Sequence, residues 1–329
     1  NLRGHDSHGI GMLPRYVDAV LEGGLDPRAR VAVLHDGGTL LRLDGQRGYG
    51  QLVGVQAMEV ACTRAATHGS CIASLAQAHH LGRIGHFAEM AAARGLVSIH
   101  FVNVLSRPIV APWGGADARF GTNPVCIGIP LPKRELFILD CATGLVAHRK
   151  MRLPHNRGAL VEPGLLIDAA GHPTTDPAVV VSNPPGLFGA ILPFGEHKGS
   201  GLAIACELLA GALTGGGTWH QAPDGRRAVL NNMLSILIDP ATLGTQAHLE
   251  REAQAFIDWL QQSPVAQGHE AVLLAGESER LQRAERLRKG IEIDAHTWSE
   301  IEAAAAKVGV RLNDPSAGNF QSNTPVAGE

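Results

Sequence analysis

The feature that most constrains the fold is an alternation of short apolar runs with longer helical runs in the first third of the chain. The predicted strands are residues 38–44, 70–76 and 96–104, and the predicted helices between them are residues 51–67 and 83–94. Gly69 and Gly95 directly follow these two helices, as expected where a helix ends in a left-handed residue. Strands that alternate with helices of this length predict an α/β fold.

Part of the sheet is predicted to be antiparallel. Strand-like runs at residues 125–130 and 136–140 are separated by a short polar interval, which leaves no room for the crossover that a parallel pair needs. The segment 48–54 imitates a dinucleotide fingerprint, but its third glycine comes one residue too late. No strand ending in Asp or Glu follows about twenty residues later, where a ribose contact would be expected. A mixed sheet is therefore favoured over a Rossmann fold.

The remaining elements are assigned in the same way. They are a helix at residues 14–22, a helix at 199–213, a strand at 232–238, a helix at 246–262 and a last helix from Thr297 to Gly309. Residues 152–187 are rich in proline and glycine and form a long irregular excursion, which is typical of functional loops. Residues 313–329 are polar, and we expect them to be frayed. The opening Asn1–Gly4 resembles the end of a helix, so we expect that N-terminal helices are missing before it.

Charge and cysteine usage limit the function classes. The net charge is -3, so no basic face is predicted for nucleic acid or for an anionic membrane. The five cysteines stand singly, without the framework typical of secreted domains, which favours a reducing compartment and a cytoplasmic location. No apolar run approaches the roughly 20 residues of a membrane-spanning helix.

The strongest chemical signal is the run from Ala78 to Gly85, where a predicted strand ends and a helix begins. Imidazole titrates near neutrality, so His80 at a strand end is suited to accept a proton from a substrate hydroxyl while a hydride leaves the same carbon. Gly82 and Gly85 allow the backbone to approach a pyrophosphate. The alternative is that His79 and His80 only cap the helix.

Two other clusters combine residue types that bind ligands. The turn from His5 to Gly9 contains two imidazoles, a carboxylate and a hydroxyl. A metal site is conceivable there, but no partner Cys or His follows at a familiar spacing, so contact with substrate or cofactor is favoured and no metal is predicted. In the run from Glu196 to Gly201, Lys198 and the N–H groups of a helix start are suited to a carboxylate or phosphate. The alternative is a solvated helix start.

Seven ordered motifs resemble the malate/L-lactate dehydrogenase family of the non-Rossmann kind, over nearly the whole chain. They are Asp6-Ser7-His8-Gly9, His80-Leu81-Gly82, Pro112-Trp113-Gly114-Gly115, Gly121-Thr122-Asn123-Pro124, Asp140-Cys141-Ala142-Thr143, Pro173-Thr174-Thr175-Asp176-Pro177, and His197-Lys198-Gly199 running into Glu207-Leu208-Leu209-Ala210-Gly211. The resemblance implies an α/β fold with a mixed-sheet, non-Rossmann nicotinamide-binding domain and a second α/β domain formed from both chain ends. It implies a terminal, dimerising domain of residues 1–68 and 265–329 and a catalytic domain of residues 69–264.

The resemblance also implies roles for individual residues. The acid/base histidine falls on His80, in agreement with its position at a strand end. The implied cofactor is NAD, with NADP as an alternative, and the implied contacts are His8, Gly82, Arg83, Ile84, Asp140, Cys141, Ala142, His197, Lys198, Gly199, Gly276 and Glu277. The expected substrate contacts are Ser7, His8, Met12, Arg15 and Lys198. A homodimer that acts on a small 2-hydroxy or 2-oxo acid is expected, without nucleic acid or membrane partners.

Departures from the family pattern bear on the substrate. Many members carry Arg where this chain has Met12, and Met has no charge with which to hold a second carboxylate. Dicarboxylates are therefore disfavoured, and a monocarboxylic, aromatic 2-oxo acid fits a polarizable Met12 better. The changes at Cys141, Gly144, Arg149 and Ser200 leave the substrate open. Malate or lactate oxidation, reduction of a cyclic 2-imino acid, and an inactive ligand-binding homologue remain alternatives.

Overall fold

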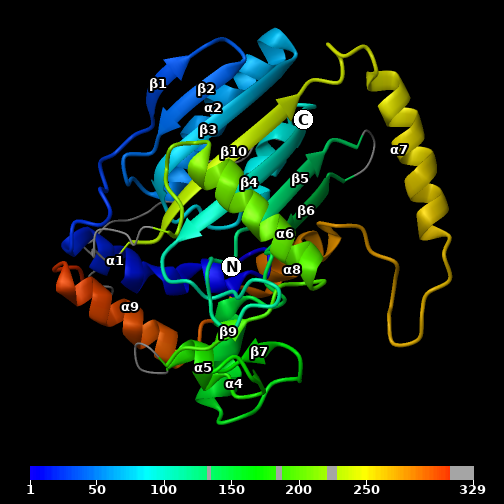
Figure 1. The fold of residues 1–329 in the computed structure, drawn as a ribbon. Coiled ribbons are helices and arrows are strands. Elements are labelled where there is room, and N and C mark those ends of the chain that lie inside the picture. The colour runs from blue at the N-terminus through cyan, green and yellow to red at the C-terminus, as the bar shows by residue number, and fades with distance from the viewer. Residues whose placement is uncertain (132–134, 183–186, 221–227, 312–329) are drawn as a thin grey trace.

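The computed structural model describes residues 1–131, 135–182, 187–220 and 228–311. Its centre is a seven-stranded sheet in the order β1-β2-β3-β10-β4-β5-β6 (Figure 1). The strands are β1 (Ala32–Asp36), β2 (Leu40–Asp44), β3 (Ser70–His79), β4 (Val97–Leu105), β5 (Val125–Ile129), β6 (Phe137–Cys141) and β10 (Leu230–Ile238). Only β2 and β3 pair in parallel, and the other neighbours are antiparallel, so the predicted mixed sheet is confirmed.

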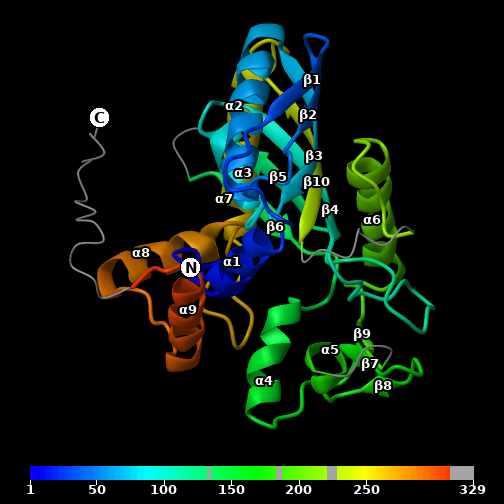
Figure 2. The same ribbon diagram turned by 90° about the vertical axis from the view of Figure 1, so that its left-hand side faces the viewer.

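Helices cover the two faces of this sheet and close its lower end. Within the described residues, the helices of the chain, including those that do not touch the sheet, are α1 (Leu13–Leu21), α2 (Gly50–His68), α3 (Gly85–Ala92), α4 (Arg152–Asn156), α5 (Ala178–Val181), α6 (His197–Cys206), α7 (Gln246–Gln261), α8 (Glu277–Lys289) and α9 (Ala295–Lys307). Figure 2 shows α2 and α3 on one face and α6 on the other; α1 contacts α9, and α8 contacts His5 and Asp6 near the N-terminus. Helices from both ends of the chain thus lie together, as the fold class predicted.

The main core lies between the sheet and α2 and α3. Val53, Ala57 and Ala61 on α2 and Phe87 on α3 are almost fully buried against strand residues such as Leu75. Apolar side chains at helical spacing form the face that α2 presents to the sheet, and their burial removes apolar area from water at about 25 cal/mol per Å².

The described part of the excursion at 152–187 forms a small substructure together with residues 190–191. Strands β7 (Leu166–Ile167), β8 (Pro173–Thr174) and β9 (Ala190–Ile191) make a three-stranded sheet in the order β8-β7-β9. A second cluster of buried side chains, including Phe120, Met151 and Leu166, joins it to the body. The short 3₁₀ segment His148–Met151 leads into α4.

Several predicted boundaries are wrong. The last helix begins at Ala295, because Asp294, and not Thr297, caps it by accepting a hydrogen bond from the Thr297 N–H. Helix α3 begins at Gly85 and not at residue 83. The predicted helix at 199–213 is α6 followed by a π-helix, Glu207–Ala212. The prediction for residues 313–329 lies outside the described residues.

The predicted division into two domains at residue 68 stays a prediction. In the structure, β1, β2 and α2 share the sheet and core of β3, since β2 pairs with β3 from Leu40 opposite Ile72 to Asp44 opposite Ala76. All five cysteines are free. Within the described residues, no helix combines the length and apolar character required to cross a membrane.

Helix α2 begins in direct contact with the end of β3. An added Cβ at Gly50 would lie 2.1 Å from the carbonyl oxygen of His79 and 2.3 Å from that of His80. Only glycine therefore fits, and the glycine-rich segment 48–54 is explained by helix packing. We expect Gly50→Ala to lower the free energy of unfolding by about 1 to 3 kcal/mol, because the backbone of β3 has to move.

Gly201→Ala is the matched control for this substitution. An added Cβ at Gly201, in α6, meets no atom within 4 Å, so alanine should raise stability by about 0.4 to 1 kcal/mol through helix propensity and chain entropy. Denaturant unfolding of both variants checks the argument. Equal effects of the two substitutions would show that the close approach at Gly50 is not a constraint.

A second stability prediction concerns His100, which is fully buried in β4. Its Nδ1 lies 2.8 Å from the Ser235 hydroxyl and its Nε2 lies 3.0 Å from the Ser98 hydroxyl. Burial lowers the pKa of His100 from 6.5 to about 4. The stabilisation by the neutral ring is therefore present above pH 6.5 and is lost as the pH falls toward 4.

We expect His100→Gln to weaken the pH dependence of stability. Between pH 7 and pH 5 the parent should lose about 2 kcal/mol more unfolding free energy than the variant, since the unfolded parent takes up one more proton. His79, whose pKa burial also lowers to about 4, is present in both chains and cancels. Parallel pH profiles from denaturant unfolding would refute this role of His100.

Candidate active site

The register of β3 against β10 shifts by one residue just before the two histidines. Gln77, at this shift, has a φ of 53°. Its N–H donates to Oδ1 of Asn232 at 2.8 Å, and its Nε2 donates to the carbonyl oxygen of Gly216 at 3.0 Å. A bulge of this kind changes the direction of the side chains that follow. It thereby sets how His79 and His80 leave the strand.

Buried amide side chains hold this end of the sheet together. Asn232 Nδ2 donates to Oδ1 of Asn103 at 2.9 Å, and Asn103 Nδ2 contacts the Glu207 carboxylate at 3.3 Å. Asn123 Nδ2 donates to the other Glu207 oxygen at 2.8 Å. Oδ1 of Asn231 accepts the N–H of Leu81, next to His80, at 2.8 Å. Burial raises the pKa of Glu207, and the bonds from the two asparagines oppose that rise.

His80 lies among side chains from three other elements. Its Nδ1 is 2.8 Å from Oη of Tyr16 on α1, and Gln51 Nε2 on α2 donates to the same Oη at 2.6 Å. The His8 ring stacks on His80 with centroids 5.3 Å apart and planes 20° apart. The Ser7 hydroxyl lies 2.8 Å from Nδ1 of His8. The structure thus brings together Ser7, His8 and His80, three of the predicted site residues.

The neighbouring His79 has a different environment. It is 2% exposed, and burial lowers its pKa to about 4. Its Nε2 accepts the Val229 N–H at 3.4 Å, while its Nδ1 is buried without a hydrogen-bond partner in the described chain. This ring is neutral at physiological pH and packs under Tyr16. Of the two histidines, only His80 faces the His8 turn.

The predicted cofactor residues after β3 lie against β6. Asp140 Oδ2 accepts the N–H of Gly85, the first residue of α3, at 2.7 Å. Arg83 bonds to Glu89 at 2.9 Å, and its Nε is 3.9 Å from Asp140. Burial raises the pKa of Asp140, against the effect of the Gly85 bond. Because this carboxylate already satisfies the start of α3, a phosphate there would meet a like charge.

Two more predicted cofactor segments join the same region. The Ile138 N–H, near Asp140, donates to the carbonyl oxygen of Ala275 at 3.2 Å, beside Gly276 and Glu277. His5 Nε2 lies 3.2 Å from Glu279 on α8 and so connects the His5–Gly9 turn to this region. Within the described residues, no group of three or more metal-binding side chains is found.

The segment of His197 and Lys198 is placed beside residues 141–143. The Phe194 N–H donates to the carbonyl oxygen of Thr143 at 3.1 Å. A Cβ at Gly199 would lie 2.1 Å from the carbonyl oxygen of Phe194, so glycine is required there. Both His197 and Lys198 are exposed. No recorded interaction connects Lys198 with His80, so the structure does not bring these two predicted residues into contact.

These segments provide groups suited to a dinucleotide. Arg83 Nε is buried without a hydrogen-bond partner in the described chain. Glu196, just before α6, has a φ of 57°, a strained value for a residue with a side chain, and such strain is concentrated at ligand sites. At Gly82, which has a φ of 78°, an added Cβ would meet only the Gln51 side chain, at 3.5 Å, whereas Gly199 is required by the Phe194 carbonyl oxygen. The unpartnered Arg83 Nε and the strained backbone of Glu196 suit a nicotinamide dinucleotide, while Asp140 disfavours a phosphate at the start of α3.

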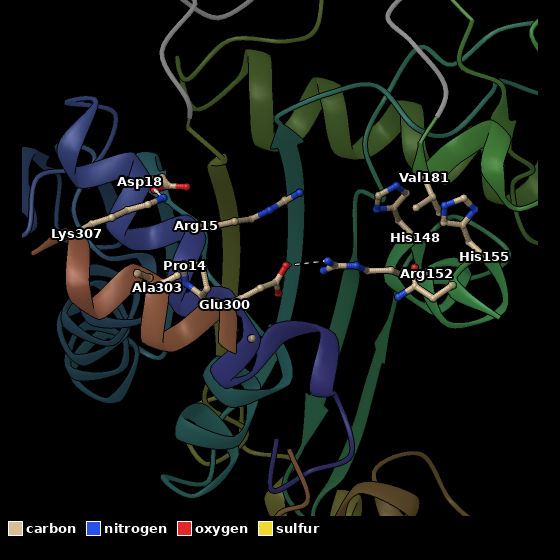
Figure 3. A pocket seen from close by; sticks show the side chains of 13 residues that line it. Pro14, Arg15, Asp18, His148, Arg152, His155, Val181, Glu300, Ala303 and Lys307 are labelled. Carbon is tan, nitrogen blue, oxygen red and sulfur yellow. Dashed lines mark hydrogen bonds and ion pairs between the residues drawn. The ribbon is translucent and has the colours of Figure 1, made fainter. Parts of the chain in front are cut away.

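Met12, which directly precedes α1, and Arg15, on α1, have different surroundings. Met12 is 3% exposed and packs with Tyr16, Ala19 and Leu25, beneath the His80 contact. Arg15 projects into a cavity of about 610 Å³ between α1, α9 and the 148–181 segment (Figure 3). Within this cavity Arg152 pairs with Glu300 at 3.0 Å, and Lys307 pairs with Asp18 at 2.7 Å.

Sequence reasoning missed several residues that position the site. Tyr16 and Gln51 gave no signal, because their role depends on contacts between α1, α2 and β3. The buried asparagines gave a usable sequence signal, because an Asn in an apolar strand needs hydrogen-bond partners when it is buried. Asn103, Asn231 and Asn232 all lie in such strands.

Comparison with known proteins identifies the relatives of this chain. The family model for malate/L-lactate dehydrogenase matches residues 1–302. Hydroxycarboxylate dehydrogenase B of Escherichia coli (strain K12) is 43% identical over 94% of this chain and 85% of its own length. L-lactate dehydrogenase of Cupriavidus necator is 40% identical over 94% of this chain and 88% of its own length.

A solved structure agrees with these matches. The structure of a putative malate/lactate dehydrogenase from E. coli superimposes with a TM-score of 0.90 at 42% identity, covering 95% of this chain and 86% of that one. The chain therefore belongs to the malate/L-lactate dehydrogenase family.

Proposed function

We propose that this oxidoreductase interconverts a 2-hydroxy acid and its 2-oxo acid with NAD or NADP, and that His80 transfers the proton. The observation that carries the proposal is the bond between His80 Nδ1 and Tyr16 Oη, with His8 stacked on the same ring. This contact fixes the orientation of an imidazole at the carboxyl end of a strand, where ligand sites of α/β proteins are found. We assign proton transfer to Nε2, the other nitrogen of the ring.

The reaction needs a hydride and a proton at two neighbouring atoms. The bound nicotinamide supplies the hydride to C2 of the 2-oxo acid, or accepts it in the reverse direction. His80 supplies the proton to the C2 oxygen and regains one from solvent, so each reduction consumes one NADH and one proton. Tyr16 holds the ring in place, and Gln51 in turn donates to the Tyr16 hydroxyl.

The proposed cofactor contacts are those that the family resemblance implied. They are His8, Gly82, Arg83, Ile84, Asp140, Cys141, Ala142, His197, Lys198, Gly199, Gly276 and Glu277. Their support is that hydrogen bonds of Asp140, Ile138 and Phe194 join these segments to residues 138–143, in β6 and the turn after it. Ser7, Met12, Arg15 and Lys198 remain the proposed substrate contacts. The homodimer and the cytoplasmic location also stay predictions.

We favour a monocarboxylic, aromatic substrate of the phenylpyruvate type over a dicarboxylate. The argument is that Met12, packed in a core cluster with Tyr16, has no charge with which to hold a second carboxylate. The runner-up function is reduction of a cyclic 2-imino acid, in which the same imidazole gives its proton to the ring nitrogen.

A panel of substrates tests this proposal. With NADH or NADPH, we expect turnover of 2-oxo acids, with a higher kcat/KM for phenylpyruvate than for oxaloacetate, because the second carboxylate finds no matching cation at position 12. Consumption of NADH and NADPH is followed at fixed cofactor concentration, with a cyclic imine in parallel. Turnover of the imine alone would favour the runner-up, and cofactor binding without any turnover would favour an inactive homologue.

The role of His80 is tested by His80→Ala. We expect kcat to fall by about 10²- to 10⁴-fold, since that is the usual contribution of general acid–base assistance. Affinity for NADH, measured by fluorescence, should stay nearly unchanged because the imidazole acts on the substrate oxygen. His68→Ala, an exposed position at the end of α2, is the control. A kcat within about threefold of the parent would move the acid/base role elsewhere, with His8→Ala as the next variant.

A further inference from the structure

Arg107 is a partly buried cation without a carboxylate partner in the described chain. It lies two residues after β4. Its guanidinium donates to the carbonyl oxygen of Val180 at 2.7 Å, approaches His148 Nε2 at 3.3 Å, and lies 3.7 Å over the Phe188 ring. Burial, and then the positive charge of Arg15, lower the pKa of Arg107. Desolvated cations of this kind are usually paired, so an uncompensated one indicates a place for an anion.

The sheet places Arg107 at the same edge as His80. Leu230, the first residue of β10, pairs with His79 on one side and with Leu105 on the other. Strands β3 and β4 therefore run in the same direction and end at the same level, with one strand between them. Two inter-strand spacings separate their backbones by about 10 Å. Side chains from the two strand ends can thus reach one small molecule.

Helix α1 connects the two positions. Tyr16 bonds to His80, while its neighbour Arg15 projects from α1 toward His148 across the cavity (Figure 3). His148 lines that cavity and also contacts Arg107. Arg107 thus contacts a histidine that lines the same cavity as Arg15.

Two carboxylates that line this cavity form ion pairs with cations other than Arg107. Glu300 pairs with Arg152 and Asp18 pairs with Lys307. Neither has a recorded ion pair with Arg107. The positive charge of Arg15 lowers the pKa of Arg107, which places a second cation close to this guanidinium.

We propose that Arg107, together with Arg15, binds the carboxylate of the substrate. This inference rests on the proposed function, since it names the residue that holds the acid group while His80 acts at C2. A guanidinium offers paired donors that match a carboxylate in two-pronged geometry. Arg107, just after β4, supplies the positive charge that Met12 lacks. A chain with Met at position 12 can therefore still hold the carboxylate of a 2-oxo acid.

The test compares Arg107→Gln and Arg107→Lys with the parent. We expect Arg107→Gln to raise KM for the 2-oxo acid by about 10- to 100-fold, as for loss of a charged hydrogen bond, with affinity for NADH and the melting temperature nearly unchanged. Arg107→Lys should recover part of the loss because it keeps the charge. Arg119→Gln is the control, since Arg119 is exposed and already paired with Asp117.

A binding measurement separates this inference from the proposed function. Oxamate, a non-reacting analogue of a 2-oxo acid, should raise the melting temperature of the parent in the presence of NADH, and Arg107→Gln should lose that rise. One outcome is that the parent turns over no 2-oxo acid while oxamate still raises its melting temperature and Arg107→Gln loses that rise. In that case the proposed function fails and the carboxylate site stands.

The alternative is that Arg107 only ties α5 to β4 through Val180. In that case Arg107→Gln lowers the melting temperature and NADH affinity together with activity, and Arg107→Lys does not restore KM. That result, or an unchanged KM and an unchanged oxamate effect, would overturn the inference. If Arg107→Gln does not fold, Arg107→Lys decides, with an expected rise in KM of about 3- to 10-fold at an unaltered melting temperature.

Discussion

The site depends first on buried hydrogen bonds between side-chain amides and the backbone at one end of the sheet. Asn232 accepts the Gln77 N–H at the bulge of β3, and Asn231 accepts the Leu81 N–H just after His80. In a medium of low dielectric constant, an unmet donor at either place is costly, so the bulge has few alternative conformations. These two hydrogen bonds therefore hold the irregular backbone between Gln77 and Leu81 in one conformation.

The helices then add what the strand end lacks. Gly50 lets α2 pack against the carbonyl groups of His79 and His80, and α2 in turn supplies Gln51 to Tyr16. Helix α1 supplies Tyr16 on the side of His80, and Arg15 on the side of the cavity. Proton transfer and recognition of the acid group, as we propose them, thus come from one short helix and two strand ends. The contact of α1 with α9 makes this arrangement depend on both ends of the chain.

Sequence reasoning identified the elements whose signal is local. Helix α2 and strands β3 and β4 follow from apolar periodicity and from the glycines that end the helices. It missed β1, a short and mostly exposed edge strand, and α8, whose charged residues on all sides leave no apolar stripe. His80 was identifiable from its place at a strand end. Tyr16 and Arg107 were not, because their chemistry arises only from contacts between segments far apart in the chain.

The central claim is that this site moves a hydride to C2 of a 2-oxo acid. The most direct measurement uses NADH carrying deuterium at the transferable C4 position, with unlabelled phenylpyruvate as the acceptor, and determines the isotope content of the product by mass spectrometry and NMR. The account predicts phenyllactate with one deuterium, located at C2. Product without deuterium at C2, or with deuterium at any other carbon, would contradict it.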